Sequence, residues 1–135
     1  MRYLALDLGD RRIGVALSDR TGMLARSLEV LRRTSRAADF AHIAALVAKH
    51  HVEAIVVGLP LNMDDTEGAQ AAWVRDYSAA LAETLDLPLY LWDERLTTVE
   101  AADIMHAQGR RADKQWIDAV AAAVILQSYL DAQRA

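Results

Sequence analysis

The stretch that decides the fold reads Tyr3-Leu-Ala-Leu-Asp7-Leu-Gly-Asp-Arg-Arg-Ile-Gly-Val-Ala-Leu-Ser-Asp19. Two apolar runs are joined by turn formers at 9–12, a pattern that predicts two antiparallel strands. The first run, 3–8, shows no polar alternation and is typical of a central strand covered on both faces of a sheet. Asp7 is therefore predicted to be buried, where a carboxylate needs a cation, a basic partner or several backbone donors. Two interpretations remain open at this point: a structural Asp that holds the turn at 10–12, or a functional acid.

Composition restricts the class of protein. The chain has 135 residues, of which 53% are hydrophobic and 25% charged, a balance that fits one domain over 1–135 and excludes a disordered chain. The absence of cysteine excludes a disulfide framework, a thiol nucleophile and Cys-ligated zinc. The first residues lead into a strand without a signal-peptide pattern, and no apolar run reaches about 18 residues. We therefore expect a cytoplasmic protein that does not bind membranes.

The net charge of −4 means that nucleic-acid binding would depend on local basic clusters. Taken singly, each such cluster is more typical of a solvated surface patch than of a phosphate contact. The three clusters are Arg11-Arg12, Arg32-Arg33 with Arg36, and Arg110-Arg111 with Lys114.

Beyond residue 19, strands alternate with helices in the order β-β-β-α-β-α-β-α-α over the whole chain. This order predicts an α/β fold with a five-stranded mixed sheet and helices on both faces. The remaining strands are expected at about 25–31, 54–58 and 89–92, and the helices from the N-cap Ser35 to His50-His51 and at about 69–85, 98–107 and 115–133.

Two acidic side chains are expected to converge at one edge of this sheet. Strands joined through helices pair in parallel by right-handed crossovers, so the strands at 54–58 and 89–92 should lie beside the first strand. Ligands of such open sheets bind at the carboxyl ends of the strands. Asp7 lies near that end of the first strand, and Glu94 directly follows the last one.

A third acid lies in the predicted last helix. Asp118 falls within a wide apolar stripe of that helix, and the alanines at 119 and 121–123 would let the helix approach the sheet closely. The alternative is that Asp118 only complements the helix dipole, a common role for Asp in a first turn. Because Asp7 and Glu94 are also unusually placed, we favour a site in which all three acids meet.

Three crowded carboxylates repel one another unless a divalent cation neutralises them. Ligands that offer only oxygen favour Mg²⁺ or Mn²⁺ over zinc, and Mg²⁺ in proteins commonly also binds substrate phosphate oxygens. Such ions support in-line hydrolysis of a phosphodiester. Asp7, Glu94 and Asp118 are therefore predicted both as metal ligands and as catalytic residues.

Four blocks in the same order span nearly the whole chain. They are Leu6-Asp-Leu-Gly9 with Arg12-Ile-Gly-Val-Ala-Leu-Ser-Asp19, Val57-Gly-Leu-Pro-Leu-Asn-Met63 with Thr66-Glu-Gly68, Asp93-Glu-Arg-Leu-Thr-Thr-Val-Glu100, and Asp118 before Val124-Ile-Leu-Gln127. Together they resemble the YqgF family, whose members are described as Holliday junction resolvases or as the nuclease that matures the 5′ end of pre-16S ribosomal RNA. The resemblance implies a ribonuclease H-like fold and catalytic carboxylates at Asp7, Glu94 and Asp118 with Mg²⁺ or Mn²⁺.

The sequence departs from the family pattern at positions that bear on metal affinity and junction cleavage. Asp65 stands where the family usually has Gly. Gln115-Trp116-Ile117 replaces the lysines that usually precede the helix Asp, with Lys114 a turn earlier. Junction resolvases of this fold also carry an acid three residues before that Asp, where this chain has Gln115. We therefore expect a nuclease that matures pre-16S rRNA, with cleavage of branched DNA as the alternative.

Candidate contacts to nucleic acid lie around the predicted acids. Arg95 has two interpretations, a bidentate phosphate clamp or an ion pair with Asp93 that holds the loop. The segment 62–65 is interpreted either as a lid over the site or as a long turn, and its position beside the strand ends favours the lid. RNA is the favoured partner, and the oligomeric state is left open, with a homodimer as one alternative. The predicted substrate contacts are Arg11, Arg12, Arg95, Thr97, Thr98, Arg110, Arg111 and Lys114, although Thr97 or Thr98 is more typical as a helix N-cap.

Two other classes of protein compete with a nuclease. The pattern from Asp7 to Gly14 also resembles the phosphate loop of actin-like ATPases and sugar kinases, which bind nucleotide between two such domains. This chain has one domain and lacks a second phosphate-binding block. A noncatalytic binding module would retain the basic clusters without a need for three buried acids. The acids therefore favour the nuclease.

Overall fold

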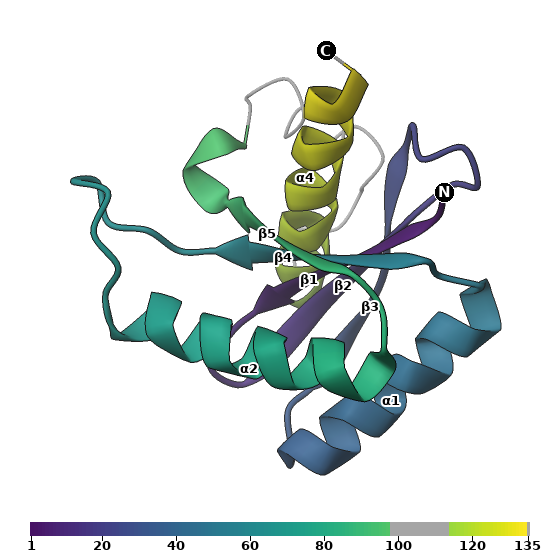
Figure 1. The fold of residues 1–135 in the computed structure, drawn as a ribbon, viewed down its shortest axis with the longest axis horizontal. Coiled ribbons are helices and arrows are strands. Elements are labelled where there is room, and N and C mark those ends of the chain that lie inside the picture. Colours follow the sequence, from purple (N-terminus) through teal and green to yellow (C-terminus); the bar gives the residue numbers. More distant parts are fainter. Residues whose placement is uncertain (98–113, 135) are drawn as a thin grey trace.

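The computed structural model of the chain describes residues 1–97 and 114–134, and within the second range the side chains from residue 119 onward. The predicted helix at 98–107 and most of the basic loop at 108–114 lie outside the described residues. The strands are β1 (Tyr3–Leu8), β2 (Arg12–Ser18), β3 (Ala25–Arg32), β4 (Ala54–Leu59) and β5 (Leu89–Asp93), and the helices are α1 (Arg36–His50), α2 (Ala69–Leu85), the 3₁₀ helix η1 (Glu94–Leu96) and α4 (Lys114–Arg134) (Figure 1).

The five strands form one mixed sheet in the order β3-β2-β1-β4-β5. β1, β2 and β3 pair antiparallel, whereas β1 with β4 and β4 with β5 pair in parallel. The turn between β1 and β2 closes through a 2.9 Å hydrogen bond from the Gly9 N–H to the Arg12 carbonyl. A Cβ at position 9 would lie 2.8 Å from that carbonyl oxygen, so the turn requires glycine. The predicted mixed sheet with Asp7 in its central strand is confirmed.

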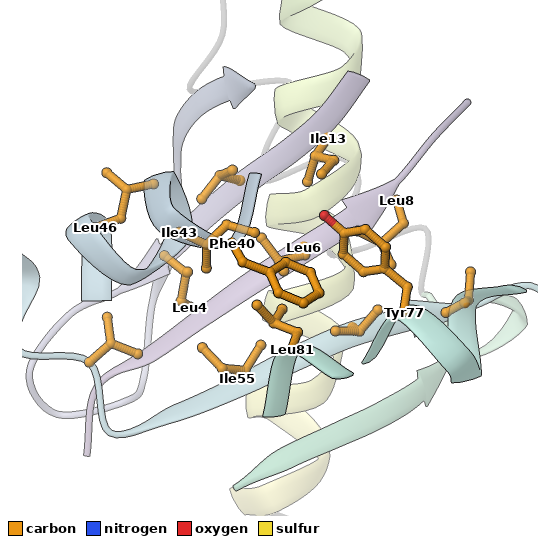
Figure 2. Packing of buried hydrophobic residues seen from close by; sticks show 14 of the residues in the cluster. Leu4, Leu6, Leu8, Ile13, Phe40, Ile43, Leu46, Ile55, Tyr77 and Leu81 are labelled. Atoms are coloured by element: carbon orange, nitrogen blue, oxygen red, sulfur yellow. The ribbon is translucent and has the colours of Figure 1, made fainter. Parts of the chain in front are cut away.

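The two faces of β1 pack in two different cores. Leu4, Leu6 and Leu8 point to the face covered by α1 and α2, where large aliphatic and aromatic side chains interdigitate (Figure 2). Ala5 points to the opposite face, where α4 packs through small and medium-sized residues such as Ala122. Helices thus cover both faces of the sheet, as the sequence predicted (Figure 1). Ser35 is also confirmed as the N-cap of α1, because its side chain accepts the Ala38 N–H.

α4 is fixed to the sheet by two adjacent polar residues that are buried. The Gln127 Oε1 accepts the Ala25 N–H at 2.9 Å, and its Nε2 donates to the Met23 carbonyl at 3.0 Å. The Ser128 Oγ donates to the Leu96 carbonyl at 2.8 Å and accepts the Trp92 Nε1–H at 3.2 Å. α4 is therefore tied both to the start of β3 and to the segment that follows β5.

α4 has 21 residues and an apolar middle. Within the described residues, neither α4 nor any other helix combines the length and the apolar character needed to cross a membrane.

Replacing Gln127 with leucine tests how much this attachment contributes to stability. The Gln127→Leu change keeps a side chain of similar size but leaves the buried Ala25 N–H without its acceptor. We expect the free energy of unfolding to fall by about 1–3 kcal/mol, measured by urea denaturation. Gln133→Leu is the matched control, because Gln133 is exposed in the same helix and should change stability little. Equal effects of the two changes would contradict this role of Gln127.

Candidate active site

Asp7 and Glu94 meet at the carboxyl ends of β1 and β5. Asp7 is the second-last residue of β1, and Glu94 begins η1 directly after β5. A side-chain hydrogen bond joins Glu94 to Asp7. Burial, followed by the charge of Asp7 and the hydrogen bond to it, raises the pKa of Glu94 to about 7. The structure therefore brings together two of the three acids that the sequence singled out.

Gly58 provides the space in which the two acids meet. β4 lies between β1 and β5, and the register pairs Leu6 with Val57, so the next residues along, Asp7 and Gly58, are neighbours. A Cβ at position 58 would lie 2.8 Å from the Glu94 Oε1. Sequence reasoning assigned no separate role to Gly58. A glycine inside an otherwise β-branched buried strand is a signal of close approach and could have identified it.

The third predicted acid, Asp118, lies in α4, and its side chain is outside the described part of the chain. It precedes by one turn Ala122, which is buried against the sheet. The carbonyl of the adjacent Ala119 accepts a 3.1 Å hydrogen bond from the Ser27 Oγ of β3, so the helix backbone next to Asp118 is held to the sheet. Among the side chains that the structure describes, no group of three or more His, Asp or Glu is arranged to hold a metal ion.

The donor set of the described pair still suits a hard divalent cation. Asp7 and Glu94 offer only oxygen atoms, which is the ligand type that Mg²⁺ and Mn²⁺ prefer. Without a cation, their mutual repulsion is relieved by a proton, as the raised pKa of Glu94 indicates. A cation between the two groups would relieve the same repulsion.

Arg33 fixes the turn that follows Asp7. Its Nη1 donates to the Gly9 carbonyl at 2.9 Å and to the Asp10 carbonyl at 2.8 Å, and its guanidinium carbon lies 4.3 Å from the ring centroid of Trp73. The prediction that the cluster containing Arg33 is a solvated patch is therefore wrong for this residue. Its partners come from distant parts of the chain, so the local run of charges could not show them.

The structure describes only some of the predicted substrate contacts. Arg11 is exposed on the turn after Asp7, and Arg12 is half-buried at the start of β2. Thr97 donates its hydroxyl to the Glu94 carbonyl at 3.0 Å and its N–H to the same oxygen at 3.2 Å, so it closes η1. The structure does not describe Thr98, Arg110, Arg111 or the side chain of Lys114.

Arg95 is engaged by carboxylates. Its Nε and Nη2 donate to the Asp93 carboxylate, with a shortest distance of 2.8 Å, and Nη2 also lies 2.8 Å from the Asp65 Oδ1. The hydrogen bonds from Arg95 hold the pKa of Asp93 below its usual range. Of the two interpretations of Arg95, the structure contains the ion pair with Asp93.

Titration of Glu94 in the metal-free protein tests the proximity of the two acids. Asp7→Asn removes the like charge, so the pKa of Glu94 should fall from about 7 but stay above 4.5, because burial remains. Glu94 binds its proton more tightly when folded, so its contribution to stability is complete below pH 4.5 and is lost as the pH rises through 7. Asp7→Asn should therefore gain stability relative to the parent over this range.

Carbon NMR of the Glu94 carboxyl group measures this pKa directly. Asp10→Asn is the control, since it removes an exposed carboxylate from the adjacent turn and should leave the titration of Glu94 as it was. If Asp7→Asn also left it unchanged, burial alone would account for the raised pKa.

Gly58→Ala should displace Glu94. The added methyl group would lie 2.7 Å from the Ile125 Cδ1 and 2.8 Å from the Glu94 Oε1, so the ends of both side chains must shift, and Ile125 is buried. We expect a loss of about 1–3 kcal/mol in unfolding free energy and a lower pKa of Glu94, because its carboxyl group leaves Asp7. Gly68→Ala is the control, because the nearest atom to a Cβ there is 3.7 Å away. An unchanged Glu94 titration in Gly58→Ala would contradict the role of Gly58.

Solved structures with the same fold include two resolvases. Thermus thermophilus RuvC, solved in complex with a Holliday junction substrate, matches with a TM-score of 0.66 and 17% identity, over 100% of this chain and 98% of that chain. The fowlpox virus resolvase, solved with Holliday junction DNA, matches with a TM-score of 0.58 and 9% identity, over 98% and 99% of the two chains. These likenesses confirm the predicted ribonuclease H-like fold.

Sequence comparison covers almost the whole chain. A relative from Anaeromyxobacter sp. (strain Fw109-5) is 49% identical over 137 residues, which cover 100% of both chains. A relative from Halothermothrix orenii is 47% identical over 135 residues, covering 98% of this chain and 96% of the relative. Both carry the name "Putative pre-16S rRNA nuclease". The predicted class, a hydrolase of phosphodiester bonds, agrees with these names.

A family model described as "RuvX: Holliday junction resolvase" matches residues 1–132. The predicted family is thereby confirmed, since RuvX is the YqgF family. This chain belongs to the RuvX (YqgF) family.

Proposed function

We propose that this protein is a metal-dependent nuclease that hydrolyses phosphodiester bonds in the 5′-end maturation of pre-16S rRNA. The observation that carries the proposal is the Asp7–Glu94 carboxyl pair at the carboxyl ends of β1 and β5, two parallel strands of the mixed sheet. Family membership and the names of full-length relatives support the reaction and favour ribosomal RNA as the substrate. This function would place the protein in the cytoplasm.

Asp7, Glu94 and Asp118 are the residues that would hold Mg²⁺ or Mn²⁺. The raised pKa of Glu94 beside Asp7 supports this assignment, because two carboxyl groups that repel each other also gain from a divalent cation. When bound, the cation supplies Lewis acidity toward the phosphate and the attacking water. The chain contributes the placement of the carboxylates, which depends on Gly58 and on the turn held by Arg33.

Basic and hydroxyl side chains around the acids would bind the phosphates of the substrate. Arg11 and Arg12 are on or beside the turn that follows Asp7, which favours contact with a strand bound at the acids. We assign the same role to Thr97, Thr98, Arg110, Arg111 and Lys114. Branched DNA is the second candidate substrate, favoured by the family description.

The proposal is tested by cleavage of labelled substrates with Mg²⁺ or Mn²⁺. We expect the parent protein to cleave a precursor fragment of 16S rRNA in preference to a four-way DNA junction. Asp118→Asn should reduce the rate by at least about 100-fold, because a charged ligand is lost from the reacting centre. Asp7→Asn and Glu94→Gln should do the same. Glu83→Gln, which neutralises an exposed acid on α2, should cleave like the parent.

Thermal melts distinguish a shared site from a structural Asp118. Without metal, Asp118→Asn should be more stable than the parent by about 1 kcal/mol, because one of three mutually repelling charges is gone. Added Mn²⁺ should raise the melting temperature of the parent more than that of the variant. A destabilised but active Asp118→Asn would end the shared-site proposal. In the cleavage assay, faster cleavage of the four-way junction than of the 16S rRNA precursor would make branched DNA the first candidate substrate.

A further inference from the structure

The guanidinium group of Arg95 joins two separate segments of the chain near Glu94. Its Nε and Nη2 donate to the carboxylate of Asp93, the last residue of β5, at 3.1 and 2.8 Å. Its Nη1 donates to the Asn62 carbonyl at 2.9 Å, and Nη2 pairs with the Asp65 Oδ1 at 2.8 Å. Every nitrogen of the group is therefore already engaged within the chain.

The surroundings of Arg95 suit a structural contact better than a phosphate contact. The side chains of Arg95 and Asp93 are 28% and 21% exposed, so water screens their interaction only in part. Two carboxylates pair with one guanidinium group, so the three side chains together carry a net negative charge. A phosphate that approached Arg95 would be repelled by Asp65 and Asp93 and would have to displace them.

Asp65 has a positive φ, a backbone conformation that disfavours residues with a side chain. Its φ is 70°, in the left-handed region that glycine adopts without strain. The turn is closed by hydrogen bonds from the Asp65 N–H to the Asn62 carbonyl and from the Asn62 N–H to the Thr66 carbonyl. Glycine would suit this turn better, so the contact with Arg95 is what the aspartate side chain adds.

Hydrogen bonds made by the neighbouring residues also hold the backbone of Glu94 in place. The Asp93 Oδ1 accepts the Arg95 N–H at 2.9 Å and caps η1, and the Thr97 N–H donates to the Glu94 carbonyl at 3.2 Å. Glu94 thus lies in a short turn whose start is fixed by Asp93 and whose second residue is tied to the 62–65 segment. Movement of Arg95 would move the Cα of its neighbour Glu94.

We propose that Arg95 and Asp65 are positioning residues, which tie the 62–65 segment to η1 and so orient Glu94 toward Asp7. The inference rests on the proposed nuclease function for its consequence in catalysis. On this inference, Arg95 orients Glu94 and does not bind substrate phosphate. Asp65 has a role that a glycine, which lacks a carboxylate, cannot fill.

Two substitutions test this assignment. Asp65→Gly relieves the left-handed strain but removes one partner of Arg95, and Arg95→Lys keeps the charge but loses the planar fork that reaches both segments. For both, we expect kcat on the precursor 16S rRNA fragment to fall by about tenfold, because a catalytic side chain is displaced. The Kd for the same RNA, measured without divalent cations, and its salt dependence should change less than about twofold.

Asp86→Gly is the matched control for Asp65→Gly. Asp86 also has a positive φ, 53°, at the C-terminal end of α2, and its substitution makes the same change in charge and strain away from Arg95. We expect kcat and Kd of this variant to equal those of the parent. An equal loss of kcat in Asp86→Gly would overturn the assignment, because the effect would then come from charge or backbone strain alone.

Binding data distinguish positioning from a phosphate clamp. If Asp65 masked a phosphate-binding Arg95, Asp65→Gly would tighten RNA binding and steepen its salt dependence by about one phosphate. That outcome, or unchanged kcat in both variants, would overturn the proposal.

Amide hydrogen exchange gives a readout that does not depend on cleavage. In Asp65→Gly, exchange of the Arg95 and Thr97 amides should be about two- to fivefold faster, the range expected for loss of one ion pair whose carboxylate is 84% exposed. If the parent cleaves no nucleic acid, the proposed nuclease function fails. Faster exchange in Asp65→Gly but not in Asp86→Gly would then still support the positioning role, and equal exchange would overturn it.

Discussion

The constraint on which the site depends is the proximity of two carboxyl groups that repel each other. Glu94 is hydrogen-bonded to Asp7, which lies near the end of the central strand, and burial together with the charge of Asp7 raises the pKa of Glu94 to about 7. Such a pair persists only when the surrounding structure determines its geometry. Gly58 leaves the space for it, Arg33 holds the turn after Asp7, and Ser128 ties the segment after Glu94 to α4. The contacts of Arg33 and Ser128 oppose the separation that repulsion favours.

The difference between the two faces of the sheet explains where the pair lies. On the face covered by α1 and α2, residues such as Leu6 and Tyr77 fill the interior (Figure 2). On the α4 face, Ala5 and Ala122 are small, so helix and sheet approach closely. Asp7 alternates with Leu6 and lies on the α4 face. The large core therefore stabilises the sheet, while the face with small side chains holds the acids.

Arg95 illustrates how one cation can serve two segments of the chain. Its contact with Asp93 is local, because the two residues are neighbours across Glu94. Its contacts with Asn62 and Asp65 reach a segment that leaves β4, the strand beside β5. The adjacent parallel strands bring these segments together at their carboxyl ends, where open sheets of this type place their functional loops.

Much of the fold could be predicted from the sequence, because the relevant signals are local. The continuous apolar run at 3–8 indicated a central strand, the turn formers at 9–12 indicated the meander, and Ser35 marked the start of α1. Their physical basis is the burial of alternating or periodic side chains and the capping of free N–H groups. Convergence of Asp7 and Glu94 followed from the topology rule for parallel strands.

The remaining features depend on partners that are far apart in sequence. The sequence left Arg95 with two equal interpretations, because nothing local shows that Asp65 would come within 2.8 Å of it. It treated Arg33 as part of a solvated cluster, although the Gly9 and Asp10 carbonyls are its partners. By itself, the sequence determined the order of the elements and the acids at the strand ends. Only the tertiary structure decided which charged side chains are bound within the chain, because any polar group that folding brings within hydrogen-bond distance can become their partner.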